Sequence, residues 1–323
     1  MDTHFPCKRI SEDGYELWLR YGAVGHPVLA EYRAALTHIV VEGASATLQA
    51  ARDELAFALP CLLGASVPLA DMAGRGALVA GTPHSSPLIA ALDLGADLAG
   101  VGDEGYVISA GPGAEPDRIV IAANTDIGVL YGVFHFLRHL QTHQPLRGLR
   151  VVSAPKVKLR MLNHWDNLDG TVERGYAGFS LWDWHKLPDY LDPRYTDYAR
   201  ANASIGINAV SLTNVNANAL VLTRPYLIKA AALADVFRPY GIRVFLTARF
   251  SAPIEIGGLD TADPLDPAVI AWWRAKADEI YAHIPDFGGF LVKANSEGQP
   301  GPHDYGRSHS DGANLLADAL APH

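Results

Sequence analysis

A lysine and a glutamate stand four residues apart directly after a short apolar run near the end of the chain. The run covers residues 290–292, Lys293 and Glu297 follow it, and glycine and proline dominate residues 298–302. A carboxyl group held by rigid backbone can act as a general acid, and an ammonium group can bind an anion. A nearby cation lowers the pKa of a carboxyl group, whereas a general acid needs a raised one. We therefore expect Lys293 to meet an anionic substrate.

Polar and aromatic side chains follow three further predicted strands in the same way. These strands cover residues 158–163, 207–213 and 242–248, and they end in NHWDN, TNVNAN and ARFSAP. In barrels and open sheets of the α/β class, the active site lies at the carboxyl ends of the strands. Aromatic faces stack on sugar rings and amides pair with hydroxyl groups. The pattern therefore favours a carbohydrate site served by a carboxylate.

Each of these residues also has a purely structural interpretation. A single glutamate after a strand is commonly a surface or capping residue, and Trp165 could plug the mouth of a barrel. Asn214, Asn216 and Asn218 could be turn formers, because asparagine tolerates left-handed backbone and makes Asx turns. The functional interpretation rests on all four strand ends being polar together.

The strands alternate with helices predicted at 197–206, 226–241 and 266–284, and a last helix begins near residue 311. This repeated βα rhythm predicts buried parallel strands. A complete (β/α)₈ barrel takes about 250 residues, which is more than the chain offers after residue 158. We therefore expect about four βα units, either as the first half of a TIM-type barrel or as a smaller open sheet.

The fold class expected is α/β, with an α+β N-terminal domain at 1–153 and the incomplete (β/α)₈ barrel at 154–323. In the first domain, residue patterning predicts a helix capped by Ser45 and a second helix from residue 126. Strands are expected at 15–21, 37–43 and 76–83, and a hairpin at 105–111 and 117–123.

Composition excludes several classes of function. The net charge of −9 argues against nucleic acid and anionic membranes as partners. The first residues contain no apolar signal segment and no apolar run reaches about 18 residues, so a cytoplasmic location is expected. His303 and His309 lack a metal-ligand spacing, and the GVGDEG sequence precedes a strand, not a helix. Neither a metal site nor a dinucleotide-binding loop is therefore expected.

Several long stretches of the chain resemble the family 67 glycoside hydrolases, the α-glucuronidases of xylan breakdown. They are SEDGYELWLRY, RMLNHWDNLDGTVERGYAG, ASIGIN with NVNAN, and GFLVKANSEGQPGPHDYGRSHSDGANLLADAL. The resemblance covers almost the whole chain. It implies an α/β N-terminal domain, a central (β/α)₈ barrel and a mostly helical C-terminal domain in the full-length protein, which could be a homodimer.

The resemblance also implies a reaction and roles for particular residues. The expected reaction is inverting hydrolysis of α-1,2-linked glucuronic acid, or its 4-O-methyl ether, from small xylooligosaccharides (aldouronic acids), without a cofactor. Glu297 matches the general acid, Lys293 a ligand of the uronate carboxylate, and Trp165 an aromatic residue at the sugar site. Val215 and Asn216 match the wall of that pocket.

The resemblance further implies that the general base and a uronate-binding arginine lie on later strands, beyond His323. The chain alone is therefore expected to be inactive, because inversion needs a second carboxylate. Thr213, Arg249 and Gly298 depart from the family pattern, and Arg249 would add a cation to the pocket. The alternatives are another retaining or inverting glycosidase with a similar N-terminal module, such as a β-hexosaminidase-like enzyme, and a non-catalytic carbohydrate-binding half-barrel.

Overall fold

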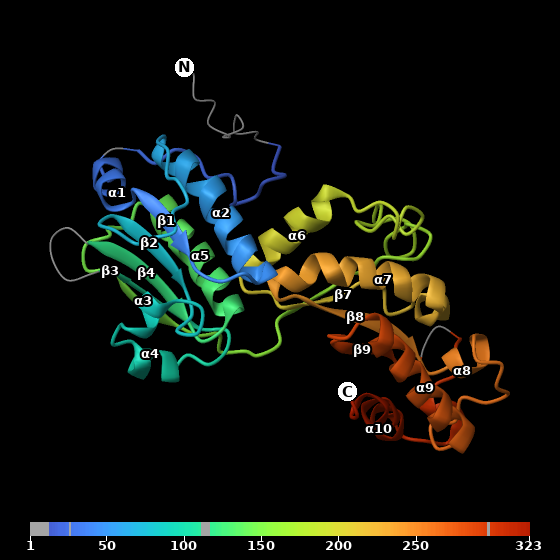
Figure 1. The fold of residues 1–323 in the computed structure, drawn as a ribbon. Coiled ribbons are helices and arrows are strands. Elements are labelled where there is room, and N and C mark those ends of the chain that lie inside the picture. The colour runs from blue at the N-terminus through green and yellow to red at the C-terminus, as the bar shows by residue number, and fades with distance from the viewer. Residues whose placement is uncertain (1–12, 26, 111–116, 296–297) are drawn as a thin grey trace. The chain divides into compact units, whose positions relative to one another are not determined.

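The computed structural model describes residues 13–25, 27–110, 117–295 and 298–323 of the chain. They form two compact units (Figure 1). The first contains the N-terminal part to Lys158 and also residues 197–206 and 239–241; the remainder up to His323 forms the second. Two short segments from the second half of the sequence therefore pack within the first unit.

The first unit is built on a five-stranded mixed sheet in the order β1-β2-β4-β3-β5. Strands β1, β2 and β4 are parallel, and β3 runs antiparallel to both β4 and β5. The strands are β1 (His38–Val41), β2 (Ala77–Gly81), β3 (Tyr106–Ala110), β4 (Arg118–Ala123) and β5 (Arg150–Ser153). The helices are α1 (Leu29–Ala35), α2 (Ala46–Leu63), α3 (Pro87–Ala90), α4 (Gly95–Ala99) and α5 (Asp126–Gln141).

Both faces of this sheet are covered, because successive strand residues point to opposite sides. Ile119 and Ile121 of β4 join the core that α2 and α5 complete, whereas Val120 between them joins the core formed with α3 and α4. Ser45 caps α2 as predicted, since its hydroxyl accepts the Leu48 N–H at 3.1 Å. The antiparallel pairing of β3 with β4 confirms the predicted hairpin strands; the residues joining them, 111–116, lie outside the described part.

The strand predicted at 15–21 is wrong. Residues 15–18 form turns, and the backbone at Leu17 and Tyr21 has positive φ angles of 50° and 47°. The alternation of apolar and polar residues does not mark one buried face of a strand, because the apolar side chains differ individually in their burial. Tyr21 is buried beside α2, whereas Leu17 and Trp18 are exposed.

A buried ion pair ties α6 (Pro193–Ser204) into the first unit through residues 197–204. The Arg200 guanidinium donates to both Glu54 oxygens, at 2.8 and 2.9 Å, and the Tyr21 hydroxyl donates to the same carboxylate at 2.6 Å. Arg200 also pairs with Asp197 at 3.0 Å. Burial, followed by the charge of Glu54, raises the pKa of the Tyr21 phenol well above its usual value. The phenol therefore remains a hydrogen-bond donor.

The second unit is built on a four-stranded parallel sheet whose order, β6-β7-β8-β9, follows the chain. The strands are β6 (Met161–Asn163), β7 (Ala209–Ser211), β8 (Arg243–Arg249) and β9 (Gly289–Lys293). The helices in and around them are α7 (Arg224–Phe237), α8 (Ala252–Glu255), α9 (Pro267–His283) and α10 (His309–Leu320), with 3₁₀ turns η1 (Ala219–Leu222), η2 (Arg238–Tyr240) and η3 (Pro302–Tyr305). The predicted strands and helices of this half are thus present.

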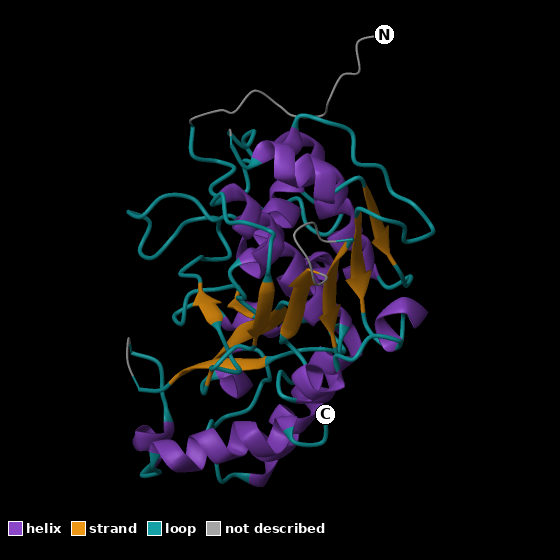
Figure 2. Ribbon diagram, turned by 90° about the vertical axis from the view of Figure 1, so that its left-hand side faces the viewer, coloured by secondary structure: helices purple, strands orange, loops and turns teal. Residues whose placement is uncertain are grey.

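The connection between β6 and α6 contains no named helix or strand and is drawn as loop in Figure 2. Tryptophan side chains fix it to the core. Trp182 is fully buried, donates from Nε1 to the Leu212 carbonyl at 3.0 Å, and packs against Phe237. Within the described ranges, every helix is too short or too polar to cross a bilayer.

Replacing Glu54 by leucine should destabilise the protein by about 3–5 kcal/mol, because it removes the buried partner of Arg200, which keeps only Asp197, and the acceptor of the Tyr21 hydroxyl. The free energy of unfolding in urea measures the effect. Asp53→Leu is the matched control, since Asp53 is the exposed neighbour on α2, and exposed changes of this kind cost about 0.5 kcal/mol or less. Equal costs for the two variants would contradict the role given to the buried pair.

Candidate active site

The loops that follow the four strands of the second sheet leave it at one edge, because all four strands are parallel. Asn163 at the end of β6 pairs with Ser211 of β7, and Arg249 at the end of β8 pairs with Lys293 at the end of β9. Side chains paired in register lie on the same face of a sheet. Arg249 and Lys293 therefore start from neighbouring positions on one face.

Lys293 contacts the loop after β7. Its side chain is only 4% exposed, and Nζ donates a short hydrogen bond to Oδ1 of Asn216. Two residues that the sequence analysis assigned to one pocket are thus in direct contact, although 77 residues separate them in the chain. A buried ammonium group beside an amide oxygen is well placed to bind an anion that enters from the strand ends.

The three asparagines after β7 have different tasks. Asn214 is a turn former: its Oδ1 accepts the Asn216 N–H at 2.9 Å, which makes an Asx turn with half-buried Val215 at its centre. Asn218 caps η1 by accepting the Leu220 N–H at 3.0 Å. The turn-forming interpretation therefore holds for Asn214 and Asn218, whereas the Asn216 side chain faces Lys293.

The charge of Arg249 is neutralised by an ion pair, which corrects the expectation that this residue adds a cation to the pocket. Its Nη1 donates to Glu255 Oε2 at 3.2 Å, and its Nη2 donates to the main-chain carbonyl of Asn216. Glu255, on the short helix α8, also accepts a hydrogen bond from Ser251. Sequence reasoning missed Glu255, and its position six residues after Arg249 gave no periodic signal.

Thr213 helps to fix the backbone that follows β7. Its hydroxyl lies 2.9 Å from the Thr247 hydroxyl, and Thr247 also donates to the Asn214 carbonyl at 2.9 Å. Both threonines are fully buried. They therefore hold the end of β7 against β8.

Trp165 presents its ring to solvent at the end of β6, with 44% of its surface exposed. Its carbonyl accepts the Glu173 N–H at 2.7 Å, and the amide of Asn167 donates to the Glu173 carbonyl at 2.6 Å. Glu173 has a φ of +57°, a left-handed conformation that is uncommon for glutamate. Asp166, next to Trp165, is buried and accepts hydrogen bonds from Ser180 and Leu181. The ring therefore stands on a firmly bonded loop.

Glu297, the predicted general acid, and Ser296 lie outside the described residues, but the residues on either side are anchored. Asn295 Nδ2 donates to Asp304 Oδ2 at 2.7 Å, and the Gly301 N–H donates to the same oxygen at 2.8 Å. A Cβ atom added to Gly301 would lie 2.6 Å from Asn295 Oδ1. Only glycine therefore permits this close approach of the two sides of the loop.

Gly298 follows the undescribed residues of this loop directly. Its φ is +75°, in the left-handed region where glycine carries no steric penalty. Asp304, which bonds both Asn295 and Gly301, was not singled out from the sequence. Its place in the GPHDY stretch, within the proline-rich turn after Glu297, was the only available signal.

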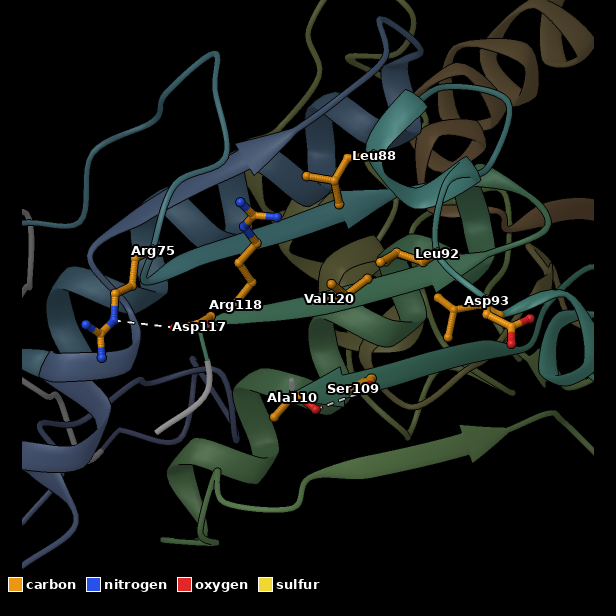
Figure 3. Close-up of a pocket in the computed structure, with 10 residues that line it drawn as sticks. Arg75, Leu88, Leu92, Asp93, Ser109, Ala110, Asp117, Arg118 and Val120 are labelled. Carbon is orange, nitrogen blue, oxygen red and sulfur yellow. Dashed lines mark hydrogen bonds and ion pairs between the residues drawn. The ribbon is translucent and has the colours of Figure 1, made fainter. Parts of the chain in front are cut away.

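No cluster of three metal-ligating side chains occurs among the residues that the structure describes. The first unit has a cavity of about 550 Å³, bordered by Leu88, Leu92, Val120 and Arg118 (Figure 3). Aliphatic and charged side chains share its wall, and the charged ones, Arg75, Arg118, Asp93 and Asp117, include a pair of opposite charge, Arg75 and Asp117. Ala110 and Asp117 flank the undescribed residues 111–116. The polar strand ends of the second unit therefore remain the candidate site.

Two family models match the chain. Residues 17–136 match the glycosyl hydrolase family 67 N-terminus, and residues 139–323 match the glycosyl hydrolase family 67 middle domain. Alpha-glucuronidase A of Emericella nidulans is 40% identical and probable alpha-glucuronidase A of Neosartorya fischeri 38% identical, each over 97% of this chain. The chain spans 37% of the length of both relatives.

Solved structures of other glycoside hydrolases share the fold. A family 115 4-O-methyl-α-glucuronidase with specificity for decorated arabinogalactans aligns with a TM-score of 0.55 at 17% identity, covering 88% of this chain and 39% of its own. A family 20 β-N-acetylhexosaminidase from Streptomyces coelicolor aligns with a TM-score of 0.51 at 14% identity, covering 93% of this chain and 61% of its own. At these identities the likeness concerns the fold alone.

Replacing Asp304 by alanine should loosen the loop around Gly301, because one carboxylate oxygen accepts from both Asn295 and Gly301. A loss of about 1.5 kcal/mol, the lower end for hydrogen bonds to charged groups, corresponds to roughly tenfold faster amide exchange at Gly301. Hydrogen–deuterium exchange measures it, with exposed Asp318 of α10 replaced by alanine as the control. Unchanged exchange at Gly301 in the Asp304 variant would show that the loop has another anchor.

Proposed function

The chain belongs to glycosyl hydrolase family 67, and from this premise we propose that it forms the uronate-binding and proton-donating part of an α-glucuronidase site. The substrate class is xylooligosaccharides that carry α-1,2-linked glucuronic acid or its 4-O-methyl ether. The reaction proposed is inverting hydrolysis. The names of the relatives support glucuronidase chemistry. The residues at the strand ends support the assignment of Lys293 to the uronate carboxylate.

The contact between Lys293 and Asn216 carries this proposal. A uronate differs from the neutral sugars of xylan by its carboxylate, so a site selective for it needs a cation at a fixed place. Lys293 is buried at the carboxyl end of β9 and hydrogen-bonded to a neutral amide oxygen. That arrangement orients the ammonium group and shields it from water, which strengthens its attraction for a carboxylate.

Glu297 is the proposed general acid. Among the described residues around it, Asn295 and Gly301 both donate to Asp304. Trp165 offers an exposed ring face for a sugar, and Val215 and Asn216 would line the pocket from the turn after β7. In this role, the carboxylic acid protonates the glycosidic oxygen as the bond to xylose breaks.

We further propose that the four parallel strands are the first half of a (β/α)₈ barrel, and that the general base comes from outside this chain. The order β6-β7-β8-β9 supports the barrel, because consecutive strands of a TIM barrel are neighbours. Inversion needs a second carboxylate about 6.5–9.5 Å from the acid to activate water. Two carboxylates described near the strand ends already have partners: Glu255 pairs with Arg249, and Asp166 accepts from Ser180 and Leu181.

In the full-length protein, Glu297→Gln should abolish hydrolysis of aldouronic acids but keep much of the activity on glucuronides with a good leaving group. The reason is that a leaving group of low pKa departs without protonation, so it does not need the acid. Steady-state kinetics on both substrate types measure the difference. Equal losses on the two would remove Glu297 from the acid role.

The 323-residue chain by itself should release no glucuronic acid from aldouronic acids, because an acid without a base cannot complete inversion. Chromatography of the products detects release, and thermal unfolding of the same sample checks that the chain is folded. Robust turnover by the isolated chain would mean that its own residues include the base.

A further inference from the structure

We propose that Arg249 and Glu255 are positioning residues for uronate binding: through the main-chain carbonyl of Asn216 they orient the residue whose side chain holds Lys293. The inference rests on the proposed function, in which Lys293 binds the substrate carboxylate. Arg249 on β8 and Glu255 on α8 would act through Asn216 and need not touch the substrate.

A continuous series of contacts connects the pair to Lys293. Glu255 accepts from Arg249 at 3.2 Å, and Arg249 donates to the Asn216 carbonyl. Asn216 then accepts from Lys293 through its side-chain oxygen. The series crosses from β8 to the loop after β7 and on to β9, so it links three of the four polar strand ends.

Both peptide groups of Asn216 are thereby held. Its N–H donates to Asn214 Oδ1 at 2.9 Å, and its carbonyl accepts from Arg249. With the backbone fixed on both sides, only the side-chain torsions of Asn216 remain free. Fixing a backbone in advance spares conformational entropy that binding would otherwise cost. The ammonium group of Lys293 is therefore offered to a ligand in one orientation.

An arginine suits this position better than a lysine. A guanidinium group is planar and directs several donors at fixed angles, so Arg249 reaches Glu255 and the Asn216 carbonyl at the same time. A lysine ammonium is a single point on a flexible stem. Arg249 also neutralises Glu255, whose charge would otherwise lie close to an anion-binding group.

The test compares two ligands of the full-length protein that differ only at the carboxyl group, which is charged in one and absent from the other. One is an aldouronic acid, and the other is the same oligosaccharide with its carboxyl group reduced to an alcohol. Isothermal titration calorimetry gives the dissociation constant of each, with a Glu297→Gln background to prevent turnover. A purely structural defect would weaken the binding of both ligands, whereas misplacement of Lys293 would weaken only the binding of the charged ligand.

Arg249→Met is expected to weaken binding of the charged ligand about tenfold, equivalent to about 1.4 kcal/mol, and to change binding of the reduced ligand less than about twofold. Arg249→Lys should behave like Arg249→Met, because it cannot make both contacts. Arg238→Met is the control: Arg238, in η2 before β8, is also ion-paired, with Asp235 and Asp286, and its replacement should leave the binding of both ligands unchanged.

The double variant Arg249→Met, Glu255→Gln separates orientation from charge and avoids leaving a partly buried carboxylate unpaired. If the pair orients Asn216, the double variant still binds the charged ligand more weakly than the parent protein. Binding restored to the parent value would overturn the positioning role. Equal weakening of both ligands in this variant would overturn it as well.

Lys293→Met distinguishes failure of this inference from failure of the proposed function. If that variant leaves binding of the charged ligand unchanged, the uronate assignment itself is wrong. If Lys293→Met weakens the charged ligand selectively and the Arg249 variants do not, the proposed function stands and only the positioning role is overturned.

Discussion

The hydrogen bond between the buried ammonium group of Lys293 and the side-chain oxygen of Asn216 connects the end of β9 to the loop after β7, and the candidate site depends on it. It joins two segments that are distant in sequence, and the parallel order of the second sheet makes it possible by bringing β7, β8 and β9 to one edge. A lysine in such a place is stable only when its surroundings meet the cost of burying its charge. The turn after β7 and the Arg249–Glu255 pair supply part of those surroundings.

The sequence is sufficient to predict most of the elements that position these groups. Apolar runs mark β8 and β9, and Ser45 marks the start of α2, because in each case local chemistry and tertiary packing agree. The stretch at 15–21 fails for the opposite reason. Its alternation satisfies a strand pattern, yet its side chains are anchored one by one and the backbone turns at Leu17.

At the site, residue type and place in the chain identify the participants but not their partners. Three asparagines follow β7 at alternate positions, and the sequence does not distinguish the one that faces Lys293 from the two that form turns. The charge of Arg249 is visible in the sequence, whereas its pairing with Glu255 depends on how α8 folds back beside β8. Such pairings arise from tertiary structure, which is why the expected extra cation proved to be neutralised.

Buried charged groups have different roles in the two units. In the first, Glu54 and Arg200 pair with each other and with Tyr21 and Asp197 as further partners, and the pair fixes part of α6. In the second, the groups near the strand ends combine a cation, neutral amides and an exposed ring, an arrangement suited to a ligand. A structure of the full-length protein with bound glucuronic acid tests this distinction most directly. The account predicts a carboxylate oxygen within about 2.7–3.2 Å of Lys293 Nζ. A sugar bound with its carboxylate directed away from Lys293 would contradict it.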